Sequence, residues 1–400
     1  MSDIPIQATT EPAEINMTSD QYKTYSLKAD GLAQLLTLLQ KRGYRVIGPT
    51  VRDGAVVLDE IQKIDELPLG WQDIQDGGKY QITQKKAKSY FGFSHGPQSW
   101  KQFLHSPSLC LLKAKKEAHD FSIENLYEKP GKTAFLGVRA CELKAIAIQD
   151  KVFLQSGFTD TYYQSHRQNN FVIAVHCSKA GGTCFCASMG TGPEINSGYD
   201  LLLTELSKDS SGAFLVRAGS DSGAAVINEL SLAEADERQI ADGKKLVAKT
   251  AGEMGRTLDT TGIKEILYKS FEHPRWQEVG ARCLSCGNCT LVCPTCFCTT
   301  IEDVTDLTGK EAERWRRWDS CFTIDFSYIH GGSVRTLPGA RYRQWLTHKL
   351  ASWQDQFGTS GCVGCGRCIT WCPVGIDITE EARVIREKDP LAAMGILEKE

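Results

Sequence analysis

Four closely spaced cysteines stand in the stretch Cys283-Leu-Ser-Cys286-Gly-Asn-Cys289-Thr-Leu-Val-Cys293-Pro294. The carboxy-terminal part of this chain is expected to fold around the group that these cysteines bind. The same spacing, C-x2-C-x2-C-x3-C-P, returns in Cys362-Val-Gly-Cys365-Gly-Arg-Cys368-Ile-Thr-Trp-Cys372-Pro373. It is the ligand spacing of a bacterial-type [4Fe–4S] site. Two residues between successive cysteines let one tight loop curl around a cluster, and the proline stops the fourth segment from continuing as a regular helix.

Where two such runs occur in one chain, the fourth cysteine of each run binds the cluster of the other run. The predicted ligands of cluster 1 are Cys283, Cys286, Cys289 and Cys372, and those of cluster 2 are Cys293, Cys362, Cys365 and Cys368. Structural zinc is the alternative, because C-x2-C pairs also bind zinc. Zinc sites usually bring two such pairs, and not two four-cysteine runs that each end in Cys-Pro, so the pattern favours iron–sulfur clusters.

The composition fits a metal-binding protein in a reducing compartment. The 400 residues include 16 cysteines, and the amino terminus has no apolar segment typical of a secretory signal. No apolar run reaches the roughly 20 residues of a membrane-spanning helix, so we expect a cytoplasmic protein without a membrane span. Arg314-Trp-Arg-Arg-Trp318 mixes basic and aromatic residues, but the balanced charge, net −3, argues against a nucleic-acid partner.

Residues 21–275 alternate between helix and strand patterns, which predicts a mixed, partly parallel α/β domain. Thr133–Val138 and Phe171–Val175 have the apolar runs of buried strands, and a helix is expected between them from Glu142 to Leu154. These three segments form a β-α-β unit. The fold class as a whole is α+β and multidomain.

Residues 276–390 contain both cysteine runs and are predicted to form an alpha-helical ferredoxin domain with two [4Fe–4S] clusters. The insertion between the runs is longer than in a compact ferredoxin, and Glu311–Trp318 and Arg341–His348 within it have helical compositions. Residues 1–20 are expected to be a disordered tail, and residues 391–400 a carboxy-terminal tail.

Four further cysteines follow the two strands of the β-α-β unit. They are Cys141, Cys177, Cys184 and Cys186. Because neighbouring parallel strands end at the same edge of a sheet, these thiols are candidates for binding a third [4Fe–4S] cluster in the α/β domain. The alternative is a set of buried cysteines that act as small apolar side chains.

Four cysteines remain outside these groups. Cys296, Cys298 and Cys321 either replace Cys141 as a ligand or pack around a cluster, and the frequent burial of free cysteine favours packing. Cys110 has no partner pattern and is expected in the core.

Several segments resemble one known family. They are Leu136–Glu142, Cys184–Pro193, Cys293–Cys298, Trp318–Phe322, Asp325–Gly332 and Gly361–Cys368. These segments are similar to the dicluster iron–sulfur beta subunit of cytosolic sulfhydrogenase-type [NiFe] hydrogenases, a family related to the A subunit of anaerobic sulfite reductase. The resemblance covers nearly the whole chain after the amino-terminal tail. It implies an alpha-helical ferredoxin domain and a complex with a flavin NAD(P)H-binding subunit and the small and large hydrogenase subunits, or with a reductase module.

The resemblance also implies a function. We expect an electron-transfer subunit that relays single electrons between a flavin- and NAD(P)H-linked partner and a hydrogenase or sulfur-compound reductase module. Two alternatives remain: the chain itself reduces polysulfide or sulfite at the α/β domain, or its clusters are mainly structural. No catalytic residues are predicted, because Gly190-Thr-Gly192 lacks the third glycine of a dinucleotide site and no His–carboxylate–nucleophile set is present in the sequence pattern.

Overall fold

An eight-stranded mixed sheet is the centre of the amino-terminal part of the chain. The computed structural model describes residues 23–387 except 87–88, 118–119, 125–128 and 207–212, so both expected tails lie outside the described residues. The strands lie in the order β12 (Ala233–Glu234), β1 (Thr24–Leu27), β11 (Phe214–Ala218), β10 (Leu201–Glu205), β9 (Asn170–Val175), β8 (Thr133–Val138), β2 (Arg45–Arg52) and β3 (Ala55–Glu60). The central strands β10, β9, β8 and β2 are parallel, and the remaining pairs are antiparallel. The expected mixed, partly parallel α/β architecture is confirmed.

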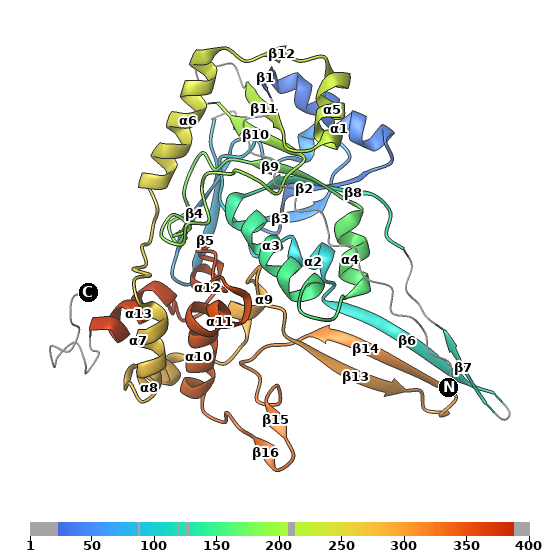
Figure 1. Cartoon of the computed structure of the whole chain (residues 1–400), viewed down its shortest axis with the longest axis vertical. Helices are drawn as coiled ribbons and strands as arrows, with labels where there is room; N and C mark the ends of the chain where they lie inside the picture. Colours follow the sequence, from blue (N-terminus) through green and yellow to red (C-terminus); the bar gives the residue numbers. More distant parts are fainter. Residues whose placement is uncertain (1–22, 87–88, 118–119, 125–128, 207–212, 388–400) are drawn as a thin grey trace.

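Helices cover both faces of this sheet, as Figure 1 shows. The core on one face includes residues of α1 (Ala29–Lys41) and α5 (Asp221–Leu230), and the core on the other includes residues of α2 (Lys101–Leu104), α3 (Ala140–Leu154) and α4 (Thr161–Gln168). Strand β9 alternates between the two cores: Phe171, Ile173 and Val175 face the first, and Val172 and Ala174 face the second. A strand buried on both faces is therefore apolar throughout, which is why the sequence shows it as one continuous run.

The carboxy-terminal part is mainly helical and has its own core. After α6 (Glu237–Gly252), its elements are α7 (Ile263–Lys269), α8 (Arg275–Arg282), α9 (Asn288–Leu291), α10 (Pro338–Thr347), η4 (His348–Ser352), α11 (Trp353–Phe357), α12 (Arg367–Thr370) and α13 (Ile378–Glu387). Leu267, Trp276, Trp345 and Ile385 are among the side chains buried there. The helix expected at Arg341–His348 corresponds to α10.

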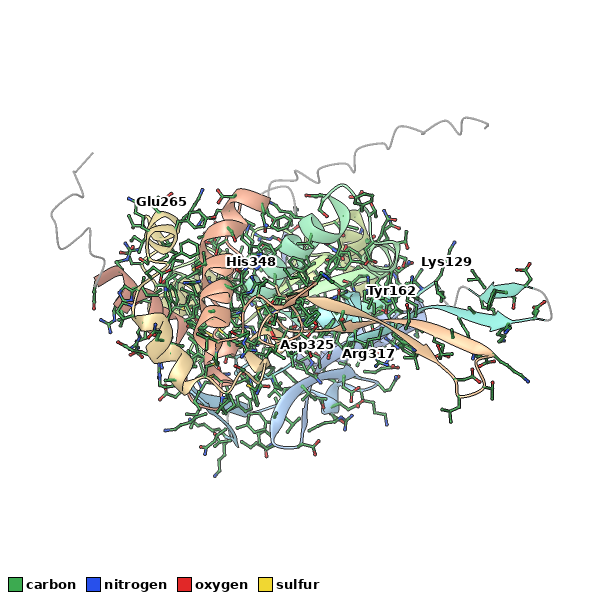
Figure 2. The ribbon with its side chains drawn as sticks, turned by 90° about the horizontal axis from the view of Figure 1, so that it is seen from below. Lys129, Tyr162, Glu265, Arg317, Asp325 and His348 are labelled. Carbon is green, nitrogen blue, oxygen red and sulfur yellow. The ribbon has the colours of Figure 1, made fainter. Side chains whose placement is uncertain are left out.

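A four-stranded ribbon extends from the body and joins the two parts (Figures 1 and 2). Its order is β13 (Thr299–Thr305), β14 (Glu311–Trp318), β6 (Ser108–Lys116) and β7 (Phe121–Glu124). The helical expectation for Glu311–Trp318 was wrong, because this segment is β14. Antiparallel pairing with β13 on one side and β6 on the other overrides its helix propensity, and Arg314 pairs with Asp303 across the strands at 2.7 Å.

Three small elements complete the described structure. They are the hairpin of β4 (Trp71–Asp76) and β5 (Lys79–Gln84), the hairpin of β15 (Tyr328–Ile329) and β16 (Gly332–Ser333), and the short helix η2 (Ile64–Glu66). Among the described residues, none of the helices combines the length and the apolar character needed to cross a membrane.

Candidate iron–sulfur sites

Site 1 is a cavity in the helical part, and its lining includes three aromatic side chains. It is lined by the four cysteines predicted to bind cluster 1, which are Cys283, Cys286, Cys289 and Cys372, with Cys368 beside them. Cys283 follows the last turn of α8 and Cys289 lies in α9, whereas Cys372 follows α12. The structure therefore brings the fourth cysteine of the second run to the first run.

Site 2 gathers the four cysteines predicted to bind cluster 2, which are Cys293, Cys362, Cys365 and Cys368. Burial raises the pKa of Cys368 well above its usual value, and the charges of Cys362, Cys365 and Cys293 raise it further. Thr295 Oγ1, which lies 3.2 Å from Cys293 Sγ, donates to the Gly361 carbonyl oxygen at 2.7 Å, so Cys293 lies beside the start of the second run. Cys293 thus lies with the second run, as Cys372 lies with the first.

Backbone N–H groups point at sulfurs in both sites. Ser285 N–H donates to Cys283 Sγ at 3.4 Å, and Ile376 N–H donates to Cys372 Sγ at 3.3 Å. In site 2, Gly364 N–H donates to Cys362 Sγ at 3.5 Å. Hydrogen bonds of this kind to ligand sulfurs are one of the means by which a protein sets the potential of a cluster.

A buried ammonium group faces site 2. Lys349 Nζ donates to Thr295 Oγ1 at 2.8 Å, and the same oxygen lies 3.2 Å from Cys293 Sγ. Burial alone would lower the pKa of Lys349, but the sulfurs of Cys293, Cys296 and Cys362 raise it well above its usual value. Lys349 is therefore charged, and it favours thiolates over thiols around it.

Site 3 is a cavity at the carboxyl ends of β8 and β9. It is lined by the four cysteines predicted for a third cluster, which are Cys141, Cys177, Cys184 and Cys186. Cys141 is the second residue of α3, which follows β8, and Cys177 follows β9. Burial raises the pKa of Cys141 and of Cys184 well above the usual value, and the sulfur of Cys186 raises both further.

His95 also lines site 3, and nothing in the sequence pattern indicated it. Its Nε2 lies 3.1 Å from Cys141 Sγ, and its Nδ1 lies 3.9 Å from a carboxylate oxygen of Glu142. Burial lowers the pKa of His95 well below its usual value, and the positive charges of Arg367 and Arg139 lower it further. The ring is therefore neutral. A lone histidine far from the cysteine motifs carries no spacing signal, so only the fold could reveal it.

The three sites are adjacent and follow one another. Cys368 belongs to site 2 and also lines the cavity of site 1, and Cys365 belongs to site 2 and also lines the cavity of site 3. Between sites 2 and 3, the Phe185 N–H donates to the Gly364 carbonyl oxygen at 2.8 Å. The buried ion pair between Arg367 and Glu142, 2.5 Å apart, ties the second run to α3 beside site 3.

The remaining cysteines lie outside these cavities. Cys298 and Cys321 lie at the base of the ribbon, where both line another pocket, and Cys296 precedes Cys298 by two residues. None of these three lines the cavity that contains Cys141. Cys110, expected in the core, is half-buried on β6 instead, because this strand belongs to the projecting ribbon.

The donor sets suit iron–sulfur clusters. Thiolates are the ligands that these clusters require, and each site offers four thiols in largely buried surroundings. Within the described ranges, no group of three or more Cys, His, Asp or Glu side chains is arranged to hold a single metal ion. A cubane binds each cysteine through a different iron, so this finding concerns single-ion sites.

Comparison with known proteins shows which family the chain represents. The model of the 4Fe-4S dicluster domain matches residues 282–376, a range that includes all eight predicted ligands of clusters 1 and 2. The chain is 31% identical over 346 residues to the sulfhydrogenase 2 subunit beta of Pyrococcus furiosus, and the alignment covers 86% of this chain and 92% of that relative. This chain belongs to the sulfhydrogenase beta subunit family. No solved structure matches it significantly.

Membership of the sulfhydrogenase beta subunit family confirms the resemblance seen in the sequence motifs. It identifies the chain as an iron–sulfur protein that contains [4Fe–4S] clusters and has a role in electron transfer. It also indicates that the chain works within a complex of several subunits.

Proposed function

We propose that this chain relays single electrons between a flavin- and NAD(P)H-linked subunit and a hydrogenase or sulfur-compound reductase module. The observation that carries the proposal is the adjacency of the three sites: Cys368 of site 2 also lines the cavity of site 1, and Cys365 of site 2 also lines the cavity of site 3. A bound [4Fe–4S] cluster accepts and donates one electron at a time. Neighbouring sites that share these cysteines would provide a path for such electrons through the protein.

We assign the ligands of each cluster as follows. Cluster 1 would be held by Cys283, Cys286, Cys289 and Cys372, cluster 2 by Cys293, Cys362, Cys365 and Cys368, and cluster 3 by Cys141, Cys177, Cys184 and Cys186. The exchanged positions of Cys372 and Cys293 support the first two assignments. The common cavity at the ends of β8 and β9 supports the third.

The residues around the sites stabilise negative charge. Lys349 is a buried cation beside site 2, and Arg367 lies between sites 2 and 3. Burial works to lower the pKa of Arg367, but the charges of Glu142, Cys365 and Cys141 raise it above its usual value. Fixed cations of this kind offset the charge of cysteine thiolates and raise the potential at which a site accepts an electron.

Site 1 is the proposed contact with a redox partner. Cys286 is exposed, and exposed apolar side chains, including Leu284 and Val374, surround the cavity mouth. The small and large hydrogenase subunits and the flavin subunit expected from the resemblance are the proposed partners. Site 3 lies within the α/β part, so electrons would pass between these two ends.

Two experiments test the relay. An anaerobic potential titration of the full chain should show clusters that are reversibly reduced, and clusters that cannot be reduced would favour a structural role. The second experiment supplies the isolated chain with an artificial electron donor and with polysulfide or sulfite. We expect no sustained turnover without partner subunits, and sustained turnover would instead support a reductase site in the α/β domain.

A further inference from the structure

Two cysteines outside the three sites line one pocket that is open to solvent. Cys298 immediately precedes β13, and Cys321 follows β14 by three residues. The register of the two strands pairs Thr299 with Trp318, and the Asp319 N–H donates to the Cys298 carbonyl oxygen at 2.9 Å. The hairpin therefore fixes both cysteines at its base, where both line the same pocket.

The pocket has a volume of about 320 Å³ and opens to solvent. It is lined by Phe297, Cys298, Thr299, Cys321, Phe326, Arg335, Gln344 and His348. Figure 2 shows one lining residue, His348, in the helical part of the chain, and Cys298 and Cys321 come from the base of the ribbon. Its walls are apolar near the aromatic rings and polar elsewhere, which suits a small organic molecule.

Arg335 gives this pocket a preference for anions. Its Nε is buried and has no hydrogen-bond partner among the described residues. None of the described lining residues is an aspartate or glutamate. Burial lowers the pKa of His348 to about 4, so its ring is neutral near pH 7 and Arg335 supplies the positive charge. An unpaired guanidinium beside two thiols fits a ligand that has both an anionic group and a reactive sulfur.

The Cys298 thiol is more acidic than the Cys321 thiol, which suits Cys298 as the attacking group in thiol–disulfide exchange. The neighbouring Cys321 thiol and the charges of Lys349 and Lys101 lower the pKa of Cys298 to about 7. The neighbouring Cys298 sulfur and burial raise the pKa of Cys321 well above its usual value. A thiol whose pKa is close to the ambient pH is the best attacking group, and a neighbouring thiol can then resolve the product.

We propose that Cys298 and Cys321 form a redox-active dithiol that reduces small anionic disulfides bound in this pocket. The Cys298 thiolate attacks one sulfur of the bound disulfide, a mixed disulfide forms, and the other half leaves as a thiolate. Cys321 then loses its proton to the solvent that reaches the open pocket and attacks Cys298 Sγ, and the second half leaves as a thiolate. The external disulfide gains two electrons and the pair of cysteines loses two, ending as a Cys298–Cys321 disulfide.

The experiment uses the full-length protein with its clusters, kept anaerobic and freed of reductant. The protein is mixed with the dianionic disulfide dithiobis(nitrobenzoate), and release of the nitrothiobenzoate is followed by absorbance. Peptide mapping without reduction then locates each modified cysteine. The native chain should contain a Cys298–Cys321 disulfide and no label on either residue. The proposal would be overturned if both residues kept the label, or if the two residues had neither the label nor a disulfide between them.

Three variants and one control variant sharpen the result. Cys321→Ser should trap the label on Cys298 as a stable mixed disulfide, and Cys298→Ser should slow modification of Cys321 by ~10-fold or more, because the attacking thiol is gone. Arg335→Gln should lower the rate of reaction with the anionic disulfide by roughly 3- to 10-fold, and the rate with the neutral disulfide dithiodipyridine should change little. Arg343→Gln is the matched control, because Arg343 does not line the pocket and pairs with Glu272.

Iron content separates this proposal from the relay. Cys298→Ser and Cys321→Ser should leave the iron per chain and the cluster spin signals unchanged. A loss of about four irons in either variant, the content of one cluster, would make these cysteines ligands and would overturn the dithiol. The exchange test needs no electron transfer by the clusters, so its outcome does not depend on whether the relay is right.

Discussion

At the scale of single residues, the sulfur atoms of this chain differ by what surrounds them. Eight cysteines could be assigned from the sequence because their spacing is specific to one kind of cluster. The four around site 3 could be grouped because parallel strands end at a common edge. His95, Lys349 and the position of Cys298 beside Cys321 could not be foreseen, since each depends on contacts or strand pairing that leave no spacing signal in the sequence.

The buried ion pair of Arg367 and Glu142 gives a prediction for stability. Both side chains are at most 5% exposed, and Glu142 also accepts a hydrogen bond from Trp100 Nε1 at 3.0 Å. Glu142→Gln removes the carboxylate that pairs with this buried guanidinium, so the free energy of unfolding should fall by about 3–5 kcal/mol. Urea unfolding monitored by tryptophan fluorescence measures the change.

The matched control for this pair is Glu387→Gln. Glu387 pairs with Arg383 at 2.7 Å on the surface of α13, where both side chains are more than half exposed. Its loss should cost less than ~1 kcal/mol. Equal effects of the two substitutions would show that the buried pair does not stabilise the junction of the helical part with α3.

His105 gives a prediction for pH dependence. Its ring lies 4.7 Å from that of Phe153, and both of its nitrogens are buried without a hydrogen-bond partner among the described residues. Burial and the charges of Arg316 and Lys101 lower its pKa from 6.5 to about 3. The unfolded chain takes up a proton first, so the stability due to neutral His105 is present above about pH 6.5 and is lost as the pH falls towards 3.

The measurement is urea unfolding of wild type and His105→Phe at about pH 7.5 and about pH 5.5. Over this interval the wild type should lose ~1 kcal/mol more than the variant, because one proton is bound only on unfolding. His330→Phe is the control, since His330 is exposed in the β15–β16 hairpin. The same pH dependence in wild type and His105→Phe would contradict the assignment.

At the scale of elements, the helices and strands with a simple period were predictable and the ribbon was not. The apolar run of β9 and the alternation of helix and strand around it indicated the β-α-β unit correctly. For β14 the composition indicated a helix, but its partner β6 lies about two hundred residues earlier in the sequence. Pairing with such a distant strand leaves no local pattern, and the helical composition of β14 also hid its hairpin with the adjacent β13, so propensity gave the wrong element.

The turn between Cys362 and Cys365 gives a prediction at this scale. Gly364 has φ +64°, and a Cβ there would lie 2.7 Å from the backbone N and Cα of Cys186. Gly364→Ala should therefore push the second run away from the Cys184–Cys186 loop, and the iron content and spin signals of sites 2 and 3 should fall while those of site 1 persist. Iron analysis and electron paramagnetic resonance measure this.

Gly358 is the matched control for that turn. It also has φ +64°, but a Cβ there would have no atom within 4 Å. Gly358→Ala should cost only the strain of the left-handed conformation, about 1–2 kcal/mol, with no loss of iron. Retention of all iron in Gly364→Ala would show that sites 2 and 3 tolerate separation of their backbones.

At the scale of the whole molecule, the two cysteine runs and the α/β part form one continuous structure. Strand β6 crosses from the sheet domain to pair with β14, and Arg256 links the Asp76 turn to Asp377 beside α13. The second run contacts the Cys184–Cys186 loop directly. This packing places site 2 between the other two sites, so the arrangement suits an electron path from the α/β part to the exposed edge at Cys286.

Counting iron per chain tests this account most directly. The anaerobically purified full-length chain should contain about twelve irons, and the Cys184→Ser/Cys186→Ser double variant about eight, with the spin signals of clusters 1 and 2 unchanged. Cys110→Ser, at a half-buried cysteine of the ribbon, should retain the wild-type content. The same iron content in wild type and the double variant would contradict a third cluster and leave the relay without its end in the α/β part.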